Sequence, residues 1–346
     1  MQDQKFVSLF PSNVNHYLHN LVFDSQKNKG VEAKVFITLK QYLKKKNIII
    51  NTYDIDTEKE PFKYVYIDMP HPWRLDVWKK IILNRGKNTF ICNEPQLVNI
   101  LNYWKPLHFF FKKIYTWYDP LVDNRKYFKI LLPKSSLGIK TKPKNFKEKK
   151  FLVLINKNML PFYPFQLLNS QGRELYSERI KSIEFFEEKI PNKFYLYGRG
   201  WNKPKKYNLT EKIFGFRKYI TYKGEVDDKI ELLSNFKFSI CFENLTGVNG
   251  WITEKIFDCF KARCVPIYWG ATDIKKYIPK ECFIDFRRFR DYDELLIFLN
   301  SIDEEKYSRY VRSIDKLLSD KKFINLWFED QFASFFLEDI LEIQNE

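Results

Sequence analysis

The sequence predicts an α/β fold made of two doubly wound domains, each with a mostly parallel sheet. Short β-rich runs alternate with helical patterns, and this alternation requires the crossover connections of parallel sheets. The alternation occurs twice, before and after a basic stretch at 134–150 that reads as a polar linker. The length of 346 residues also suits two domains of roughly 100 to 200 residues each.

The first half supplies the elements of one α/β domain. We expect strands at Lys5–Phe10, Ile48–Tyr53, Tyr64–Asp68 and Thr89–Cys92, and helices at Val35–Lys45 and Trp73–Leu83. These elements predict an N-terminal domain at residues 1–148.

The second half repeats the same alternation. We expect strands at Phe151–Ile155, Phe194–Tyr197, Phe238–Phe242, Val265–Trp269 and Phe283–Phe286, and helices at Arg173–Glu187, Lys229–Asn235, Glu254–Lys261 and Asp293–Leu299. These elements predict a C-terminal domain at residues 149–346, facing the first domain across a cleft. Its last segment, Glu304–Glu346, reads as helices that pack back on the first domain.

The composition favours a globular protein with anionic partners. The chain carries 59 basic and 43 acidic residues, a net charge of +16. Such a balance attracts nucleotide phosphates, lipid phosphates, anionic membranes or nucleic acid. No apolar run approaches the roughly 20 residues that span a bilayer, and the N-terminus lacks a secretory pattern. We expect a cytoplasmic protein, with peripheral association at the inner face of a membrane left open.

The cysteines, histidines and paired aspartates do not predict a metal site. Five cysteines without C-x-x-C spacing favour free buried thiols over a disulfide framework or zinc site. His16 and His19 read as surface residues. Asp54 and Asp56 have the spacing of a metal clamp, and we interpret them instead as a solvated turn after a strand of the first domain.

The segment from Phe238 to Phe289 carries the strongest chemical signal. A strand ends at Glu243 and Asn244, a glycine-bearing loop follows, and a helix begins near Thr253, a suitable N-cap residue. The free N–H groups of such a helix attract anions. Lys255 in the first turn is unfavourable by roughly 0.3 to 1 kcal/mol unless an anion such as a diphosphate offsets it. The alternative is a lysine that extends into solvent.

This segment resembles the α-1,3/1,4-fucosyltransferases of glycosyltransferase family 10. The resemblance covers about fifty contiguous residues and is carried by Phe242-Glu243-Asn244, Thr253-Glu254-Lys255, Val265-Pro266-Ile267-Tyr268-Trp269-Gly270, Tyr277-Ile278-Pro279 and Phe283-Ile284-Asp285-Phe286. It reaches more weakly upstream to Arg173 and Tyr197-Gly198. In the first domain Asn93-Glu94-Pro95 is similar to the family's Glu-Pro element.

The resemblance implies a GT-B fold in which residues 1–148 bind the acceptor and residues 149–346 bind the nucleotide sugar. It also implies an inverting transfer of L-fucose from GDP-β-L-fucose to a glycan hydroxyl, in an α-1,3-type linkage. It implies that Glu94 is the catalytic base. Donor binding is assigned by the same carry-over to Arg173, Asn244, Trp251, Glu254 and Lys255. Trp251 departs from the tyrosine common in the family. Glu243, Thr253 and Arg179 are further candidates, and Arg179 competes with Arg173 for the donor diphosphate.

We expect no cofactor and no essential divalent metal, because cationic side chains replace the ion at the diphosphate. The acceptor class includes lipid-linked glycans and lipopolysaccharide, so protein glycosylation and lipopolysaccharide biosynthesis are both open, as is the oligomeric state. One alternative is a GT-B transferase that uses a different nucleotide sugar. A basic nucleic-acid-binding protein is the other, although no helix-turn-helix, zinc-finger or RNP-like segment supports it.

Overall fold

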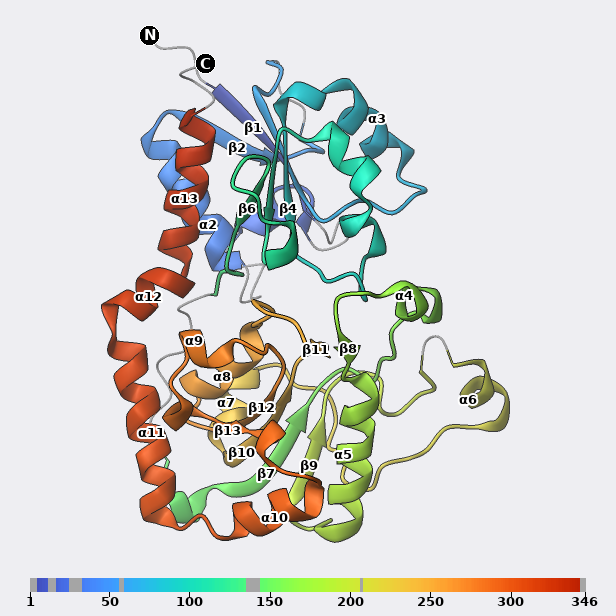
Figure 1. Ribbon diagram of the computed structural model, residues 1–346, viewed down its shortest axis with the longest axis vertical. Helices are drawn as coiled ribbons and strands as arrows, with labels where there is room; N and C mark the ends of the chain where they lie inside the picture. The colour runs from blue at the N-terminus through green and yellow to red at the C-terminus, as the bar shows by residue number, and fades with distance from the viewer. Residues whose placement is uncertain are drawn as a thin grey trace. The chain divides into compact units, whose positions relative to one another are not determined.

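A computed structural model describes residues 5–11, 17–24, 33–55, 59–134, 144–205 and 208–342. The chain forms two compact units (Figure 1). Unit 1 contains residues 1–137 together with 321–346, and unit 2 contains residues 138–320. The last helices therefore belong to the same unit as the first strands. No helix among the described residues is long and apolar enough to cross a membrane.

Unit 1 is built on a parallel sheet with the strand order β2-β1-β3-β4-β5-β6. Its strands are β1 (Lys5–Phe10), β2 (Ile48–Thr52), β3 (Lys63–Ile67), β4 (Asn88–Cys92), β5 (Lys113–Thr116) and β6 (Tyr127–Lys129). Every residue of β3 and β4 is buried. Strands that are buried at every position have no solvent-facing side, as expected for a parallel sheet with helices on both faces.

Two layers of helices cover the sheet of unit 1 (Figure 1). They are α2 (Ala33–Lys45) and α13 (Glu329–Glu342) on one face and α3 (Leu75–Leu83) on the other. Helix α12 (Lys321–Trp327) leads into α13, and the unit also has short 3-10 turns η1 (Leu21–Phe23), η2 (Arg85–Lys87), η3 (Ile100–Tyr103), η4 (Lys105–Phe110) and η5 (Asp119–Leu121). Residues alternate between the faces: Val65 joins the core under α2 and α13, whereas Tyr66 joins the core under α3. Lys63, which is fully buried, pairs with Asp339 of α13 and ties that helix to the sheet.

Unit 2 has a parallel sheet of order β13-β12-β10-β7-β9. Its strands are β7 (Lys150–Ile155), β9 (Phe194–Tyr197), β10 (Phe236–Phe242), β12 (Val265–Trp269) and β13 (Ile284–Asp285). A separate antiparallel ribbon joins β8 (Arg173–Glu174) to β11 (Leu245–Thr246). Strand β11 follows β10 almost directly in the chain, so the ribbon is held beside the carboxyl end of the central strand.

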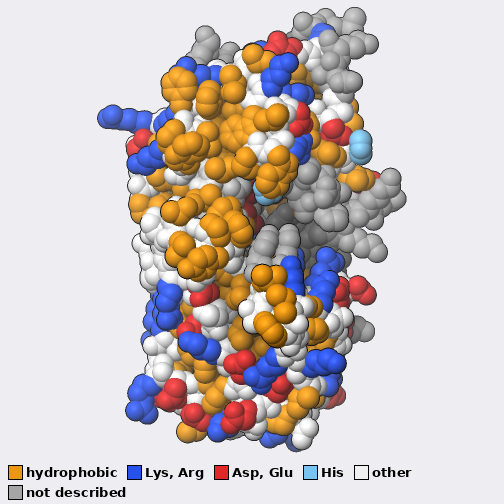
Figure 2. All heavy atoms as spheres, turned by 90° about the vertical axis from the view of Figure 1, so that its right-hand side faces the viewer, with side chains coloured by type: hydrophobic (Ala, Val, Ile, Leu, Met, Phe, Trp, Pro, Cys, Tyr) orange, Lys and Arg blue, Asp and Glu red, His pale blue; other side chains and the backbone are white. Residues whose placement is uncertain are grey.

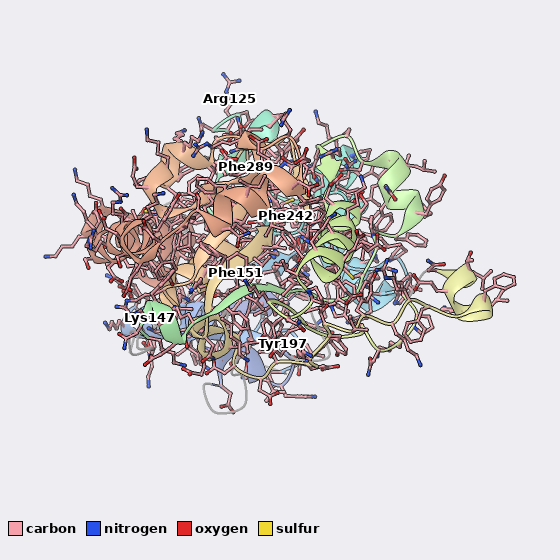
Figure 3. All side chains as sticks on the ribbon, turned by 90° about the horizontal axis from the view of Figure 1, so that it is seen from below. Arg125, Lys147, Phe151, Tyr197, Phe242 and Phe289 are labelled. Atoms are coloured by element: carbon pink, nitrogen blue, oxygen red, sulfur yellow. The ribbon has the colours of Figure 1, made fainter. Side chains whose placement is uncertain are left out.

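Helices surround the second sheet and enclose one core. They are α4 (Tyr163–Leu168), α5 (Tyr176–Lys189), α6 (Leu209–Phe214), α7 (Lys229–Ser234), α8 (Glu254–Lys261), α9 (Ile274–Tyr277), α10 (Tyr292–Asn300) and α11 (Glu304–Ser319), with 3-10 turns η6 (Phe146–Glu148), η7 (Lys280–Cys282) and η8 (Phe286–Arg288). Phe242, which ends β10, lies in the packed interior (Figure 3). Its ring centroid is 5.4 Å from that of Trp269 and 5.1 Å from that of Phe286.

The predicted fold class is confirmed, and several predicted bounds coincide with the structure, including those of α8, β9 and β12. Two predictions are wrong. Arg173 does not begin a helix; it pairs in β8, and α5 begins at Tyr176. Asp54 is not solvated, because its side chain is 14% exposed and pairs with His19. Asp56, His16 and most of the basic linker (135–143) lie outside the described residues. All five cysteines are free and buried.

Candidate functional site

The carboxyl ends of β10 and β12 gather most of the predicted donor-binding residues. After Phe242 the chain leaves β10 through Glu243 and Asn244, forms β11, and returns through a loop to α8. The backbone N–H of Glu243 donates to the Trp269 carbonyl at 2.8 Å, which joins the two strand ends. Ligands of open α/β sheets bind at this edge.

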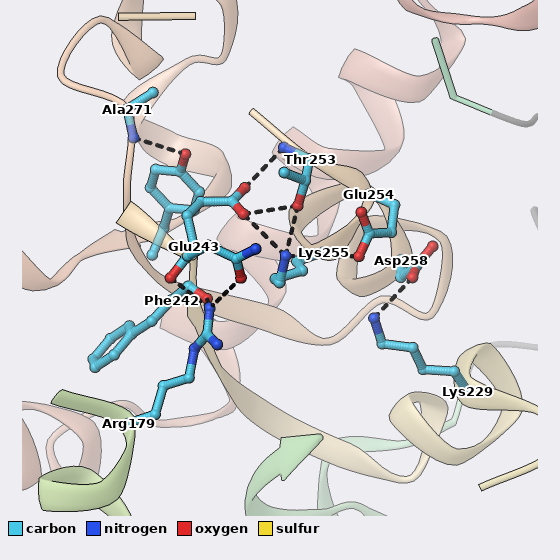
Figure 4. Close-up of polar contacts among 11 residues, drawn as sticks. Arg179, Lys229, Phe242, Glu243, Thr253, Glu254, Lys255, Asp258 and Ala271 are labelled. Carbon is cyan, nitrogen blue, oxygen red and sulfur yellow. Dashed lines mark hydrogen bonds and ion pairs between the residues drawn. The ribbon is translucent and has the colours of Figure 1, made fainter. Parts of the chain in front are cut away.

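Glu243 is the buried anchor of this edge (Figure 4). Its carboxylate accepts hydrogen bonds from the Thr253 N–H at 2.8 Å, from the Thr253 hydroxyl at 2.7 Å and from the Lys255 ammonium at 3.1 Å. A fully buried carboxylate is stable only when it is paired in this way. Glu243 therefore fixes the start of α8 against the end of β10.

Gly270 leaves the space that Glu243 occupies. A Cβ atom at this glycine would lie 2.4 Å from Cγ of Glu243 and 2.5 Å from the hydroxyl oxygen of Tyr268. The Tyr268 hydroxyl accepts a hydrogen bond from the Ala271 N–H at 3.1 Å, and both Tyr268 and Glu243 are fully buried. The turn after β12 thus requires a residue without a side chain.

Thr253 occupies the N-cap position of α8 but does not cap the helix with its side chain. Its hydroxyl instead lies between the Glu243 carboxylate and the Lys255 ammonium, from which it accepts a hydrogen bond at 2.9 Å. The first-turn N–H groups of α8 are left without a side-chain cap from Thr253. The positive end of the helix therefore remains available to an anion.

Lys255 stays charged at this helix end. Burial lowers its pKa, but the carboxylates of Glu243 and Glu254 outweigh burial, and the net pKa is raised. Its ammonium is 3.1 Å from Glu243 and 3.7 Å from Glu254. The side chain of Lys255 is 17% exposed and that of Glu254 is 47% exposed, so both reach the surface at the start of α8.

Arg179 of α5 holds the last residues of β10. Its guanidinium is buried and donates to the carbonyls of Phe242, at 2.9 Å, and of Glu243. It also donates to the Asn244 side-chain oxygen at 2.9 Å. Burial lowers the pKa of Arg179. The contact with Arg179 orients the Asn244 amide, whose Nδ2 then faces no hydrogen-bond acceptor among the described residues.

Arg173 lies at the same edge and is exposed. In the β8–β11 ribbon it stands opposite Thr246. Its side chain is 59% exposed and 3.8 Å from the Glu178 carboxylate, and its guanidinium lies 4.9 Å from the Trp269 ring centroid. The structure thus brings Arg173 to the end of β12, whereas Arg179 faces the protein interior.

Trp251 precedes α8 in the loop after β11, and its ring is 3% exposed. The neighbouring Gly250 N–H donates to the Asp273 carboxylate at 2.9 Å and holds this loop to the segment after β12. Trp251 therefore lies beneath the loop surface.

Glu94 occupies the corresponding edge of the sheet in unit 1. It follows β4, and its backbone N–H donates to the Asp68 carboxylate at 2.8 Å. Its carbonyl accepts from the Asn102 amide at 3.0 Å and from the Tyr103 hydroxyl at 3.2 Å. The backbone of Glu94 is therefore fixed from three directions while its side chain is half-buried.

Asp68 and Asn102 are the supports that sequence reasoning missed. The Asp68 carboxylate is buried and also accepts from the Asn93 N–H at 2.9 Å and the Asn102 amide at 2.6 Å. Its φ angle is 59°, a left-handed conformation in which Asp is enriched. The only signal in the sequence is that Asp68 follows strand β3, and this position alone does not indicate the turn.

Among the described residues, no group of three or more His, Cys, Asp and Glu side chains could hold a metal ion. The charged groups at the end of β10 are instead paired cations and carboxylates. With Lys255 and the start of α8, this arrangement can bind an anion. The adjacent Glu254 carboxylate can accept hydrogen bonds from hydroxyl groups.

Comparison with protein families places this edge in a known domain. Residues 177–324 match the model of glycosyltransferase family 10 (fucosyltransferase), C-terminal part. This segment, which is less than half of the chain, is similar to the C-terminal part of the family 10 fucosyltransferases; we call it the family 10 segment. The family 10 segment contains both strand ends described above, together with α8.

Curated relatives match the chain over limited lengths. An alpha-(1,3)-fucosyltransferase of Helicobacter pylori is 36% identical over 81 residues, which is 23% of this chain and 17% of the relative. A 4-galactosyl-N-acetylglucosaminide 3-alpha-L-fucosyltransferase 9 of Bos taurus is 32% identical over 131 residues, 34% of this chain and 36% of the relative. The matches thus span well under two thirds of these proteins.

Solved structures show the fold over nearly the whole chain. An alpha1,3-fucosyltransferase has a TM-score of 0.54 at 16% identity, with 98% of this chain and 90% of that chain covered. WaaG, a glycosyltransferase involved in lipopolysaccharide biosynthesis, has a TM-score of 0.52 at 8% identity, with 95% and 99% covered. The fold of the chain is therefore the GT-B type.

Proposed function

We propose that this protein is an inverting glycosyltransferase that moves L-fucose from GDP-β-L-fucose to a hydroxyl of a glycan, in an α-1,3-type linkage. The observation that carries the proposal is the family 10 segment at residues 177–324. Its Lys255 and the N-terminus of α8 lie at the ends of β10 and β12, where the exposed Arg173, just before the segment, joins them. A diphosphate leaving group requires such a cluster of positive charge.

Three side chains are proposed to bind the diphosphate. Arg173 presents a planar fork to two phosphate oxygens, and Lys255 presents a point charge. The Asn244 amide, oriented by Arg179, donates a third hydrogen bond. The uncapped first turn of α8 adds the partial charge of its N–H groups. Because these groups supply the charge, we propose that no divalent metal is required.

Glu254 and Trp251 are proposed to complete the donor site. The Glu254 carboxylate is 47% exposed at the start of α8, where it accepts hydrogen bonds from the ribose hydroxyls. Trp251, whose ring is buried, supports the donor loop from beneath. Its indole occupies the place of the tyrosine common in the family.

The proposed reaction is a single in-line displacement. Glu94 accepts the proton of the acceptor hydroxyl as that oxygen bonds to the anomeric carbon, and the bond to the GDP oxygen breaks on the opposite face. The β-linked donor then gives an α-linked product. The backbone contacts of Glu94 to Asp68, Asn102 and Tyr103 hold the base in place.

Calorimetric titration with GDP in the presence of a chelator tests the donor assignments. Arg173→Ala and Lys255→Ala should each weaken GDP binding at least tenfold, because a hydrogen bond to a charged group contributes about 1.5 to 3 kcal/mol. Glu94→Ala should bind GDP normally and lose turnover. Arg290→Ala is the matched control, since its side chain is 87% exposed in the same unit as Arg173.

Equal loss of GDP affinity in the Arg173, Lys255 and Glu94 variants would overturn these role assignments. The alternative donor is tested separately by release of the nucleotide from GDP-fucose, GDP-mannose and UDP-glucose. Turnover of UDP-glucose alone would keep the fold and replace the proposed substrate.

A further inference from the structure

The outward side of α3 and η4 in unit 1 is apolar. Six large side chains on this surface are exposed: Trp73 72%, Leu75 73%, Ile82 54%, Leu83 71%, Trp104 55% and Phe109 53%. We call these six residues the apolar face. Most monomeric proteins expose such residues singly, and gathered groups mark interaction sites.

Helix α3 is apolar on two opposite sides. Val77 and Ile81 are buried against the sheet. Leu75, Ile82 and Leu83 follow the i, i+7, i+8 spacing of the other side, where a surface helix normally carries polar residues. The outward residues are therefore not required by the core of unit 1.

The end of α3 and η4 form one continuous surface. The Arg85 guanidinium lies 3.3 Å from the Phe109 ring centroid, and its Nε donates to the Phe109 carbonyl at 3.2 Å. The Asn88 amide donates to the carbonyls of Ile81, at 2.7 Å, and Phe110, at 3.1 Å. Figure 2 shows the apolar side chains gathered on this side of unit 1, with lysine and arginine side chains among them.

The charge around the apolar face is almost entirely positive. Segments 71–87 and 104–112 carry seven cations, Arg74, Lys79, Lys80, Arg85, Lys87, Lys105 and Lys112. Asp76 is the one carboxylate in these segments, and Arg74 holds it at 2.8 Å. Lys79 and Lys105 are exposed. Exposed tryptophans and aliphatic side chains within a basic surround match the interface of a bilayer with anionic headgroups.

We propose that the apolar face docks unit 1 onto an anionic lipid surface. The tryptophans and leucines enter the headgroup boundary, and the surrounding cations contact lipid phosphates. Self-association through the same face would bring the cations of two copies together. The carboxylates Asp76 and Glu60 are already held by Arg74 and Lys87 and leave the other cations in excess, which opposes a dimer. The proposal does not depend on fucosyl transfer, and it assigns a surface of the first unit rather than the donor site.

Vesicle flotation at low and high salt tests the proposal with the full chain. The vesicles contain phosphatidylcholine alone or phosphatidylcholine with phosphatidylglycerol. The test variant is Leu75→Ser with Leu83→Ser, and the matched control is Ile220→Ser with Ile297→Ser in unit 2, whose side chains are 74% and 71% exposed. A second test variant, Lys79→Gln with Lys105→Gln, removes charge only.

We expect the unmodified chain and the isoleucine control to float with phosphatidylglycerol vesicles and to be released by salt. The leucine variant and the lysine variant should each bind at least tenfold more weakly, while their GDP affinity and unfolding midpoints stay unchanged. Equal flotation of the leucine variant and the control would overturn the proposal. A dimer in sedimentation that the leucine variant dissociates, without any lipid binding, would overturn it as well.

Discussion

Replacing Gly270 by alanine tests how the carboxyl ends of β10 and β12, which we call the donor edge, are packed. The new Cβ would lie 2.4 Å from Cγ of Glu243 and 2.5 Å from the Tyr268 hydroxyl oxygen, whereas ordinary contacts lie at 3.4–4 Å. Neither side chain can move aside cheaply. Glu243 is fully buried and held by Thr253 and Lys255, and Tyr268 is fully buried.

The expected loss of stability follows from these contacts. Overpacking a filled site costs about 1 to 3 kcal/mol. Displacing Glu243 from Lys255 loses a charged hydrogen bond of roughly 1.5 to 3 kcal/mol. We therefore expect unit 2 of Gly270→Ala to lose about 2.5 to 6 kcal/mol of unfolding free energy. GDP affinity should fall at least tenfold because Lys255 and the start of α8 shift with Glu243.

Urea unfolding and GDP calorimetry measure the two effects. Gly86→Ala is the control, because no atom lies within 4 Å of its added Cβ and its φ does not disfavour a side chain. It should stay within about 1 kcal/mol of the unmodified chain. If Gly270→Ala matched Gly86→Ala in both stability and GDP affinity, the packing described for Glu243 would be refuted.

Three further predictions concern buried polar groups. Asp68→Ala should lower kcat at least tenfold and leave GDP affinity unchanged, because the backbone N–H groups of Asn93 and Glu94 lose their acceptor. An unchanged kcat would show that Asp68 does not position Glu94. Lys63→Ala should cost about 1.5 to 3 kcal/mol in urea unfolding, since Asp339 loses one buried charged hydrogen bond and keeps those from Lys113 and Tyr115; a loss below about 0.5 kcal/mol would contradict this contribution. Burial lowers the pKa of Lys149 to about 8, below its value of about 10.5 in the unfolded chain. Between about pH 8 and 10.5 Lys149 is therefore protonated in the unfolded chain and neutral in the folded protein. Over this range its contribution to the free energy of unfolding rises with pH by up to about 3 kcal/mol. The free energy of unfolding of Lys149→Met, measured from pH 7 to 10.5, should lack that rise. If the variant and the unmodified chain had the same pH profile, the lowered pKa of Lys149 would be refuted.

Local patterns sufficed for the elements that frame the donor edge. Thr253 at a helix start and the apolar stripe of Ile256, Phe257 and Phe260 define α8 without reference to the rest of the chain. The apolar run Val265–Trp269 does the same for β12, which is buried at its first four positions. Periodicity and apolar runs are short-range signals, so these bounds could be read from the residues alone.

Contacts between distant segments could not be read in this way. The strand that holds Arg173 exists because Arg173 pairs with Thr246, far along the chain, so helical spacing nearby misled the prediction. Arg179 has helical spacing like its neighbours, and only the carbonyls at the end of β10 make its burial favourable. The support of Glu94 likewise combines Asp68 and Asn102 from separate segments.

The most direct test of the account is the reaction of GDP-β-L-fucose with an N-acetyllactosamine acceptor in the presence of a chelator, followed by NMR of the product. We predict release of GDP and an α-linked fucoside without added metal. A β-linked product, a strict requirement for Mn²⁺, or release of nucleotide only from a donor other than GDP-fucose would contradict it.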